Sequence, residues 1–309
     1  MPRLIETDES DSIELGELVE RLETDGFDPD DEECFASFGP ALRKLANNGR
    51  FLADLVIEEL KQQCARQIAR NPYSAQVIVL HTGSRKYLLR ANFWPALGDS
   101  VVASSGLDPF FYGFPHDHNF SFLTVGYLGS GYWSDYFEYD YETVEGWTGE
   151  PVDLRFIERS RLGPGKVLLY RRNLDVHRQL PPDDMSVSLN IVGLSDRSEF
   201  LDQYQFDAER GEIAGILNPS SLEALVLLAG HFGGEDGCQL VDDFAARHPS
   251  ERIRSAALRS KASRIADVDG RIELFERAAA ENKGLVAAVA SREARRVAAA
   301  RSWIESAAG

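Results

Sequence analysis

The chain has 309 residues, 43% hydrophobic and 10% aromatic, enough to bury the core of one large domain or two smaller ones. Its formal net charge of −17 argues against a protein whose main partner is nucleic acid or an anionic membrane surface. Cys34, Cys64 and Cys238 show no CxxC spacing, which indicates neither a disulfide framework nor a cysteine-based zinc site and favours a reducing cytoplasm. The N-terminus is acidic and the apolar stretches are shorter than the roughly 18 residues that span a bilayer, so we expect no secretion signal and no membrane anchor.

The first part of the chain, residues 1–71, is predicted to be helical. Apolar residues recur at helical spacing over residues 11–69, and polar turns at 28–31 and 47–49 interrupt the pattern. We therefore expect a helical N-terminal segment.

The middle part, residues 72–210, consists of short runs rich in β-branched and aromatic residues, separated by Gly, Pro and Asp. The predicted strands are 75–80, 86–94, 119–127, 132–139, 152–158, 166–170 and 187–192. A series of short strands without intervening helices is typical of a sandwich or barrel.

The last part, residues 211–309, is predicted to be an α-helical domain, because from Pro219 onward the helical period returns and alanine becomes frequent. Breaks are expected at 233–234, 248–250 and 267–270. Residues 248–258 resemble the helix of a HEAT-like repeat, and the alternatives are such a repeat array and a small α-helical bundle. In either form these helices are a candidate contact for a protein partner or a larger substrate.

Two histidines two positions apart, His116 and His118, stand just before a predicted strand. Alternate residues of a strand share a face, so both imidazoles would project the same way and Asp117 the other way. The pair is either a two-ligand metal clasp or two ordinary polar residues on an exposed strand.

The downstream pattern favours the metal clasp. Gly129 follows His118 by eleven positions, and after it come a Gly-Pro-Gly turn at 163–165, an apolar strand at 167–170 and a third histidine, His177. This order resembles the two motifs of the cupin superfamily. The resemblance covers about residues 80–200 and implies an α+β chain, in which a cupin-type β-barrel (double-stranded β-helix) stands between the two helical parts.

Many cupins carry a carboxylate ligand four residues after the second histidine, where this chain has Phe122. The strings around His116-Asp117-His118 and around His177 are similar to those of cysteine dioxygenase and related thiol dioxygenases. That resemblance implies that His116, His118 and His177 bind Fe(II) and that the substrate is oxidised with O2.

Two features of the thiol dioxygenases are altered in this chain. Carried over residue by residue, the family's Ser-His-Tyr set falls on Ser188, Asn190 and Val192, so only the serine remains, as a candidate catalytic residue. The cross-link cysteine of the animal enzymes falls on Leu123. These departures leave a thiol or another substrate open.

A substrate-binding cation is expected from strand 86–94. Alternation places Leu88, Arg90, Asn92 and Trp94 on one face, and if this face lines the barrel, Arg90 is a buried cation near the metal. By resemblance to the thiol dioxygenases, Arg90 or Arg85 would hold a substrate carboxylate through bidentate hydrogen bonds, the alternative being a surface arginine.

The leading hypothesis is a cytoplasmic oxidoreductase, a mononuclear non-haem Fe(II) dioxygenase or oxygenase of the cupin type. Its partners would be O2 and a small-molecule or peptide substrate, with no nucleic acid and no membrane. Three neutral imidazoles leave the metal's charge uncompensated, which favours an anionic substrate. Zinc or another divalent metal is the alternative, giving a hydrolase or isomerase. A non-catalytic cupin that binds a metal or a ligand is a third hypothesis.

Overall fold

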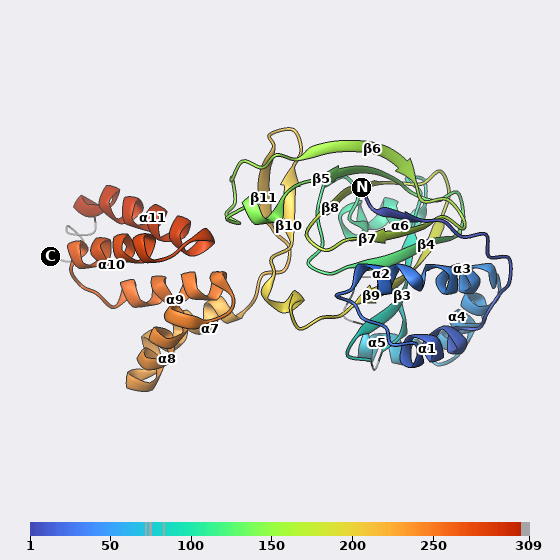
Figure 1. Ribbon diagram of the computed structural model, residues 1–309, viewed down its shortest axis with the longest axis horizontal. Coiled ribbons are helices and arrows are strands. Elements are labelled where there is room, and N and C mark those ends of the chain that lie inside the picture. The colour runs from blue at the N-terminus through green and yellow to red at the C-terminus, as the bar shows by residue number, and fades with distance from the viewer. Residues whose placement is uncertain (72, 74–75, 83, 304–309) are drawn as a thin grey trace. The chain divides into compact units, whose positions relative to one another are not determined.

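The structure is a computed structural model that describes residues 1–71, 73, 76–82 and 84–303. The chain divides into two compact units, whose elements are labelled in Figure 1. The first unit comprises Met1–Tyr141, Val152–Glu199 and Gln203–Glu212, and the second comprises Glu142–Pro151, Phe200–Asp202 and Ile213–Gly309. The second unit therefore includes a loop from the strand-rich part of the sequence as well as the C-terminal helices.

Two antiparallel sheets form the framework of the first unit. The larger has the strand order β1-β7-β4-β9-β3-β2, and the smaller has the order β6-β5-β8. The strands of the larger sheet are β1 (Arg3–Ile5), β2 (Val77–His81), β3 (Tyr87–Trp94), β4 (Phe122–Leu128), β7 (Val167–Tyr170) and β9 (Ser186–Gly193). Those of the smaller are β5 (Trp133–Glu138), β6 (Arg155–Arg161) and β8 (Asp175–Leu180). The remaining strands, β10 (Tyr204–Asp207) and β11 (Glu212–Ile216), pair with each other.

The two sheets pack face to face. A cluster of buried aromatic and aliphatic side chains joins Trp94, Phe122 and Tyr170 of the large sheet to Tyr136 of the small one. The hydroxyls of Tyr136 and Tyr170 lie 3.1 Å apart. The interior between the sheets is therefore the part of the unit that is enclosed from solvent on two sides.

The predicted mixed helix-and-sheet class is confirmed, whereas a closed cupin-type barrel is not, because the sheets are open. The segment before β4 meets β8 through isolated bridges and not a ladder: His116 and His177 exchange backbone hydrogen bonds of 3.0 Å, and the Gly113 amide donates to the Gln179 carbonyl over 2.9 Å. Pro115 precedes the bridge at His116 and has no N–H to donate, so a continuous ladder is interrupted there.

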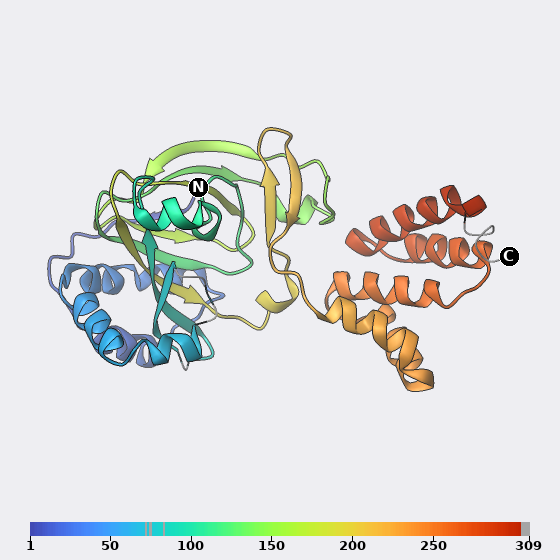
Figure 2. The same ribbon diagram turned by 180° about the vertical axis from the view of Figure 1, so that it is seen from behind.

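The N-terminal helices cover the outer face of the large sheet, as the blue elements in Figures 1 and 2 show. They are α1 (Leu15–Thr24), α2 (Glu32–Ser37), α3 (Gly39–Asn47), α4 (Phe51–Lys61) and α5 (Ala65–Arg70). Leu18 and Leu42 of these helices share one core with Leu89, Leu123 and Ile191 of the sheet, and each of the five is at most 1% exposed. Burying such side chains contributes roughly 1.5 to 3 kcal/mol each, so this helical segment is part of the first unit's core.

The predicted breaks at 28–31 and 47–49 fall between helices, but the three-residue strand β1 was not predicted. It pairs with β7, placing Arg3 opposite Leu169, and three residues are too few for a period to be recognised. Pro72 and Ala75, at the start of the predicted strand region, lie outside the described residues. A short helix α6 (Ser100–Ser105) and the single turns η1 (Asp108–Phe110), η2 (Tyr141–Thr143) and η3 (Ser198–Phe200) complete the connections.

From Leu222 onward the C-terminal part of the second unit is helical, as predicted, but the start of the predicted helical part 211–309 is wrong, because residues 212–216 form strand β11 and pair with β10. The helices of this part are α7 (Leu222–Phe232), α8 (Gly234–Arg247), α9 (Glu251–Ser263), α10 (Val268–Glu281) and α11 (Gly284–Ala299). Ser250 accepts a hydrogen bond from the Ile253 amide at the start of α9, and Asp267 accepts one from the Gly270 amide in α10, so two of the predicted breaks are helix caps. Two apolar clusters share α9, an arrangement that suits both a bundle and a repeat array, and the HEAT-like repeat stays a prediction. Within the described residues, no helix combines the length and the apolar character that crossing a bilayer requires.

Candidate metal centre

Three buried histidines converge in the interior of the first unit. His116 and His118 lie in the segment that leads into β4, and His177 lies in β8. One ring nitrogen of each comes within 4.8 Å of the others. Their exposed fractions are 3%, 8% and 1%, so the cluster is closed to bulk water. The structure thus brings together the three residues that the sequence predicted as metal ligands.

The hydrogen bonds of the rings show which nitrogen atoms are free. Nδ1 of His116 lies 3.2 Å from the Phe114 carbonyl oxygen and donates to it, because a carbonyl can only accept. Nδ1 of His177 lies 3.3 Å from the Tyr170 hydroxyl. The Nε2 atoms of His116 and His177 then face each other at 3.2 Å, and Nδ1 of His118 has no hydrogen-bond partner.

Burial keeps all three imidazoles neutral. Desolvation lowers the pKa of His116 to about 4, while the hydrogen bond to Phe114 acts weakly in the other direction. The pKa values of His118 and His177 lie well below the ordinary value for the same reason, and the neighbouring histidines lower them further. Neutral imidazoles at neutral pH have the lone pairs that a metal ion requires.

These residues fit a divalent transition metal. Two imidazole nitrogens bound about 2.1 Å from one ion, at angles of about 90 to 109 degrees, lie roughly 3.0 to 3.4 Å apart. The 3.2 Å separation between the Nε2 atoms of His116 and His177 falls within this range. A cation would also satisfy the orphaned ring nitrogen of His118. Among the residues described, no carboxylate or cysteine joins the cluster.

Asp117 holds the HxH segment in place from the side opposite the imidazoles. Its carboxylate accepts hydrogen bonds from the Tyr204 amide (2.6 Å), from Asn173 Nδ2 (3.4 Å) and from the Tyr139 hydroxyl. Asp117 is fully buried, and this burial raises the pKa of its carboxyl to about 7. The alternation expected from the sequence therefore sends the two histidines and the aspartate in opposite directions.

Tyr170 fixes the orientation of the third histidine. Its hydroxyl contacts Nδ1 of His177, lies 3.1 Å from the hydroxyl of Tyr136, and is also within hydrogen-bonding reach of Tyr132. Burial raises the pKa of Tyr170 well above its ordinary value, so the hydroxyl stays protonated. Hydrogen-bond partners of this kind set the tautomer of a metal-binding histidine. The sequence pattern places Tyr170 at the end of a predicted strand and does not reveal this role.

The inner face of the large sheet carries polar groups beside the histidines. The register places Arg90 opposite Asn190, and Asn190 opposite Thr124 on the next strand. Several buried side-chain atoms around this row have no hydrogen-bond partner: Arg90 Nε, Asn92 Oδ1, Thr124 Oγ1, Gln179 Oε1 and Asn190 Oδ1. Buried polar atoms are normally satisfied, so a set of orphaned ones indicates a place where a ligand binds. Thr124 and Gln179 were not singled out by the sequence.

Arg90 is a buried cation without a counter-charge. The residue is 8% exposed, burial lowers its pKa, and its guanidinium lies 5.0 Å from the centre of the Tyr73 ring. Its charge disfavours protonation of His118, so the two groups interact electrostatically. In the part of the chain that the structure describes, no carboxylate forms an ion pair with Arg90. Arg85, the alternative considered from the sequence, is exposed in the β2–β3 turn.

The other positions carried over from the thiol dioxygenases are divided between the two faces of the sheet. Ser188 is buried and accepts a hydrogen bond of 2.9 Å from Trp94 Nε1, so its hydroxyl already has a structural partner. Asn190 and Val192 face the same interior. Leu123 belongs to the outer core beneath the N-terminal helices, away from the histidines, because it alternates with Phe122. Phe122 instead lies beside the cluster, with its ring centroid 4.8 Å from that of His118.

Comparisons with known proteins give little further information. No protein-family model matches the chain, and no curated protein matches it. Among solved structures it is similar to a hydroquinone 1,2-dioxygenase from Sphingomonas sp. TTNP3 with 4-hydroxybenzoate bound, at 8% identity over 41% of this chain and 70% of that chain, with a TM-score of 0.27. It is also similar to the DMSP lyase DddQ from Ruegeria pomeroyi DSS-3, at 15% identity over 63% of this chain and 77% of that one, with a TM-score of 0.24. Both scores are too low to carry a fold or an activity over to this chain.

Proposed function

We propose that this chain is a cupin-type metalloenzyme, a mononuclear non-haem Fe(II) oxygenase related to the thiol dioxygenases, which uses O2 to oxidise a small or peptidyl anionic substrate. The observation that carries the proposal is the pairing of three buried, neutral histidines with a buried arginine that lacks a counter-charge. The histidines fit a metal ion, and the arginine fits an anion beside it.

The residues of this chain have distinct tasks in the proposal. His116, His118 and His177 would hold the metal, which when bound as Fe(II) supplies the redox chemistry with O2. Arg90 would bind a carboxylate or another anionic group of the substrate through charge-assisted hydrogen bonds. The orphaned polar atoms of Asn92, Thr124, Asn190 and Gln179 would bind the remaining polar atoms of the substrate. Because these groups are buried, substrate binding would exclude water.

Ser188 has a positioning role in this proposal. Its hydroxyl binds the Trp94 indole, which in turn lies against Tyr132 with ring centroids 4.0 Å apart. Loss of the hydroxyl would leave the buried indole N–H of Trp94 without an acceptor and weaken the packing of Trp94 against Tyr132.

Elemental analysis of protein purified anaerobically without added metal tests the metal centre. We expect iron in the wild type and its loss in His116→Ala, His118→Ala and His177→Ala, each with an unchanged far-UV circular dichroism spectrum. His231→Ala is the matched control, because His231 is exposed on α7 and does not belong to the cluster. Full occupancy in one of the three cluster variants would remove that histidine from the site.

Oxygen uptake by the iron-loaded protein tests the activity. We expect uptake with a small thiol that carries a carboxylate, such as cysteine, or with another small carboxylate, and none with the metal-free protein. An iron-loaded protein that consumes no oxygen with any of a panel of such substrates would favour the non-catalytic binding protein.

A zinc-dependent hydrolase or isomerase is the second candidate. Three neutral imidazoles without a carboxylate are also the donor set of zinc sites that activate water. Stoichiometric zinc and no iron in the same elemental analysis would establish this alternative in place of the oxygenase.

A further inference from the structure

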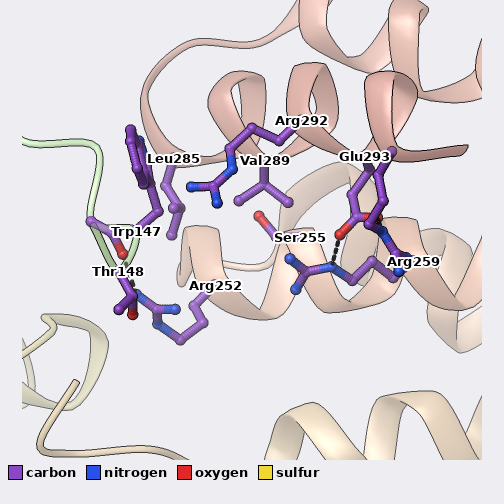
Figure 3. A pocket seen from close by; sticks show the side chains of 11 residues that line it. Trp147, Thr148, Arg252, Ser255, Arg259, Leu285, Val289, Arg292 and Glu293 are labelled. Carbon is purple, nitrogen blue, oxygen red and sulfur yellow. Dashed lines mark hydrogen bonds and ion pairs between the residues drawn. The ribbon is translucent and has the colours of Figure 1, made fainter. Parts of the chain in front are cut away.

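The second compact unit contains a pocket of about 430 Å³ that the metal centre does not use. Its walls are the loop residues 146–148, one face of α9 and one face of α11, as Figure 3 shows. Every lining residue belongs to the second unit, and none is part of the histidine cluster. A volume of this size is typical of sites for small organic ligands.

Arginines dominate the lining. Arg252 and Arg259 of α9 are seven residues apart, and Arg292 and Arg296 of α11 are four apart, so each pair lies on one side of its helix. Glu293 is the acidic residue among those that line the pocket. The pocket therefore has an excess of positive charge, on a chain whose overall charge is −17.

The acidic groups nearby do not neutralise all of this charge. Glu293 shares its two oxygens between Nε of Arg259 (3.0 Å) and Nε of Arg296 (2.7 Å), so it does not bind the terminal amino groups of either guanidinium. Arg292 stacks over the Trp147 ring, 4.2 Å from its centre, and across the described residues no carboxylate forms an ion pair with it. Arg292 is exposed, and its contact with the Trp147 ring holds the guanidinium in position.

Hydrogen bonds hold the loop of residues 146–148 in place. The buried carboxylate of Glu150 accepts hydrogen bonds from the amides of Glu145 (2.7 Å), Gly146 (2.7 Å) and Trp147 (3.1 Å). Arg252 donates to the Asp202 carboxylate from Nε (2.9 Å) and Nη2 (2.6 Å), and Nη2 also donates to the Gly146 carbonyl over 3.0 Å, which ties the loop to α9. Trp147 is therefore placed before a ligand arrives, which lowers the entropic cost of binding.

The floor of the pocket is apolar. Leu285 and Val289 of α11 are buried, and Figure 3 shows Trp147 beside Leu285. A ligand that fills the pocket therefore needs an anionic group for the guanidiniums and a flat apolar body for the wall formed by Trp147, Leu285 and Val289. Guanidinium groups bind phosphate oxygens with matched, bidentate geometry.

We propose that this pocket binds a phosphate monoester carried on a flat apolar group, of about the size of a nucleotide. Arg259 and Arg292 bind the phosphate, and Trp147 with the Leu285–Val289 floor contacts the organic part. The site is independent of the metal centre and of its proposed activity.

Isothermal titration calorimetry of the full-length protein with AMP, adenosine and inorganic phosphate tests the proposal. We expect AMP to bind more tightly than inorganic phosphate, and adenosine not to bind. Arg292→Gln should weaken AMP binding by about tenfold or more, because a charge-assisted hydrogen bond is lost. The matched control is Arg295→Gln, since Arg295 is exposed on the same helix and does not line the pocket, and it should bind AMP like the wild type.

Five outcomes would overturn the proposal. If AMP does not bind at millimolar concentration, the pocket is not a site for such a phosphate ester. Equal affinities for inorganic phosphate and AMP would show that the apolar wall does not contribute to binding. Equal affinities for adenosine and AMP would show that the phosphate group does not contribute to binding. Unchanged binding by Arg292→Gln, or binding that is lost in His118→Ala, would place AMP elsewhere in the protein.

Discussion

Arg90 is a buried cation that forms no ion pair with a carboxylate of the described residues. A buried cation without an anion costs several kcal/mol, and proteins normally avoid it. The residue is retained beside three histidines whose neutrality also depends on burial. This combination of groups is unfavourable in the free protein and becomes favourable when an anion binds.

Replacing Arg90 with Met should therefore stabilise the free protein. We expect Arg90→Met to raise the free energy of unfolding by about 1 to 2 kcal/mol, because an apolar side chain of similar length replaces an uncompensated buried charge. Urea denaturation in the absence of ligand measures this change. Arg85→Met, at an exposed turn position, should stay within about 0.5 kcal/mol of the wild type. A clear loss of stability in Arg90→Met would show that Arg90 supports the fold, through Tyr73, rather than a ligand.

The buried histidines and Asp117 have opposite effects on the pH dependence of stability. The pKa of His116 is about 4 when folded against 6.5 ordinarily, so the unfolded chain binds more protons between these values and stability rises with pH there. The pKa of Asp117 is about 7 against 3.8, so the folded chain binds the extra proton and stability falls as pH rises. The three histidines together therefore change the stability with pH more than the single carboxyl does, and the stability should rise with pH.

The free energy of unfolding of the chelator-treated protein should accordingly increase from about pH 4 to pH 6.5, by up to about 1.4 kcal/mol per pH unit for each buried histidine. Asp117→Asn removes the opposing carboxyl and should make the increase steeper. Urea denaturation across this pH range measures both slopes. A flat profile in the wild type would mean that the histidines are not buried as the structure has them.

At the scale of elements, the alternation of β3, β4 and β9 separates two chemically different surfaces. Leu89, Leu123 and Ile191 enter the core under the N-terminal helices, while Arg90, Thr124 and Asn190 face the histidines. A shift of one residue in register would exchange these two sets, so the register decides whether the site exists. The turns that fix the register are therefore essential to the site.

Gly129, the glycine that ends the first motif, occupies such a turn after β4. Its φ is +81°, and a Cβ atom there would lie 2.2 Å from the Met185 carbonyl oxygen. We expect Gly129→Ala to cost about 2 kcal/mol or more, because both the backbone conformation and the close approach exclude a side chain. Gly98→Ala, where nothing lies within 4 Å, is the control and should be nearly neutral. Chemical denaturation compares them, and equal stabilities would contradict the geometry of this turn.

On the scale of the whole molecule, the two candidate sites lie in two different compact units. The three histidines and the partners of Asp117 belong to the first unit, whereas the arginine pocket belongs to the second. The units are interleaved along the sequence, because residues 142–151 and 200–202 group with the C-terminal helices. The predicted domain boundary between residues 210 and 211 stays a prediction.

A chain truncated after Asn218 should fold and retain its metal, because Tyr139, Asn173 and Tyr204, which hold Asp117, all precede the cut. Elemental analysis and thermal unfolding of the truncated protein measure this. The full-length chain is the reference for metal content. A truncated protein that is folded and metal-free would show that the C-terminal helices complete the site.

The sequence by itself determined the features that depend on local period and spacing. Helical spacing predicted the two helical parts, and alternation placed His116 with His118 and Arg90 with Asn92. The motif resemblance supplied His177, although the strand that carries it, β8, was not predicted.

Tertiary structure alone decided the remaining features. Two of these are contacts within the first unit, the pairing of β1 with β7 and the contact between Tyr170 and His177. The others are the absence of a carboxylate partner for Arg90 among the described residues, and the pocket that Trp147 lines together with helices more than a hundred residues later in the chain. The reason is that a hydrophobic period records only which face of an element is buried. The partner of that face, and the charges that meet there, are set by contacts between segments far apart in the chain.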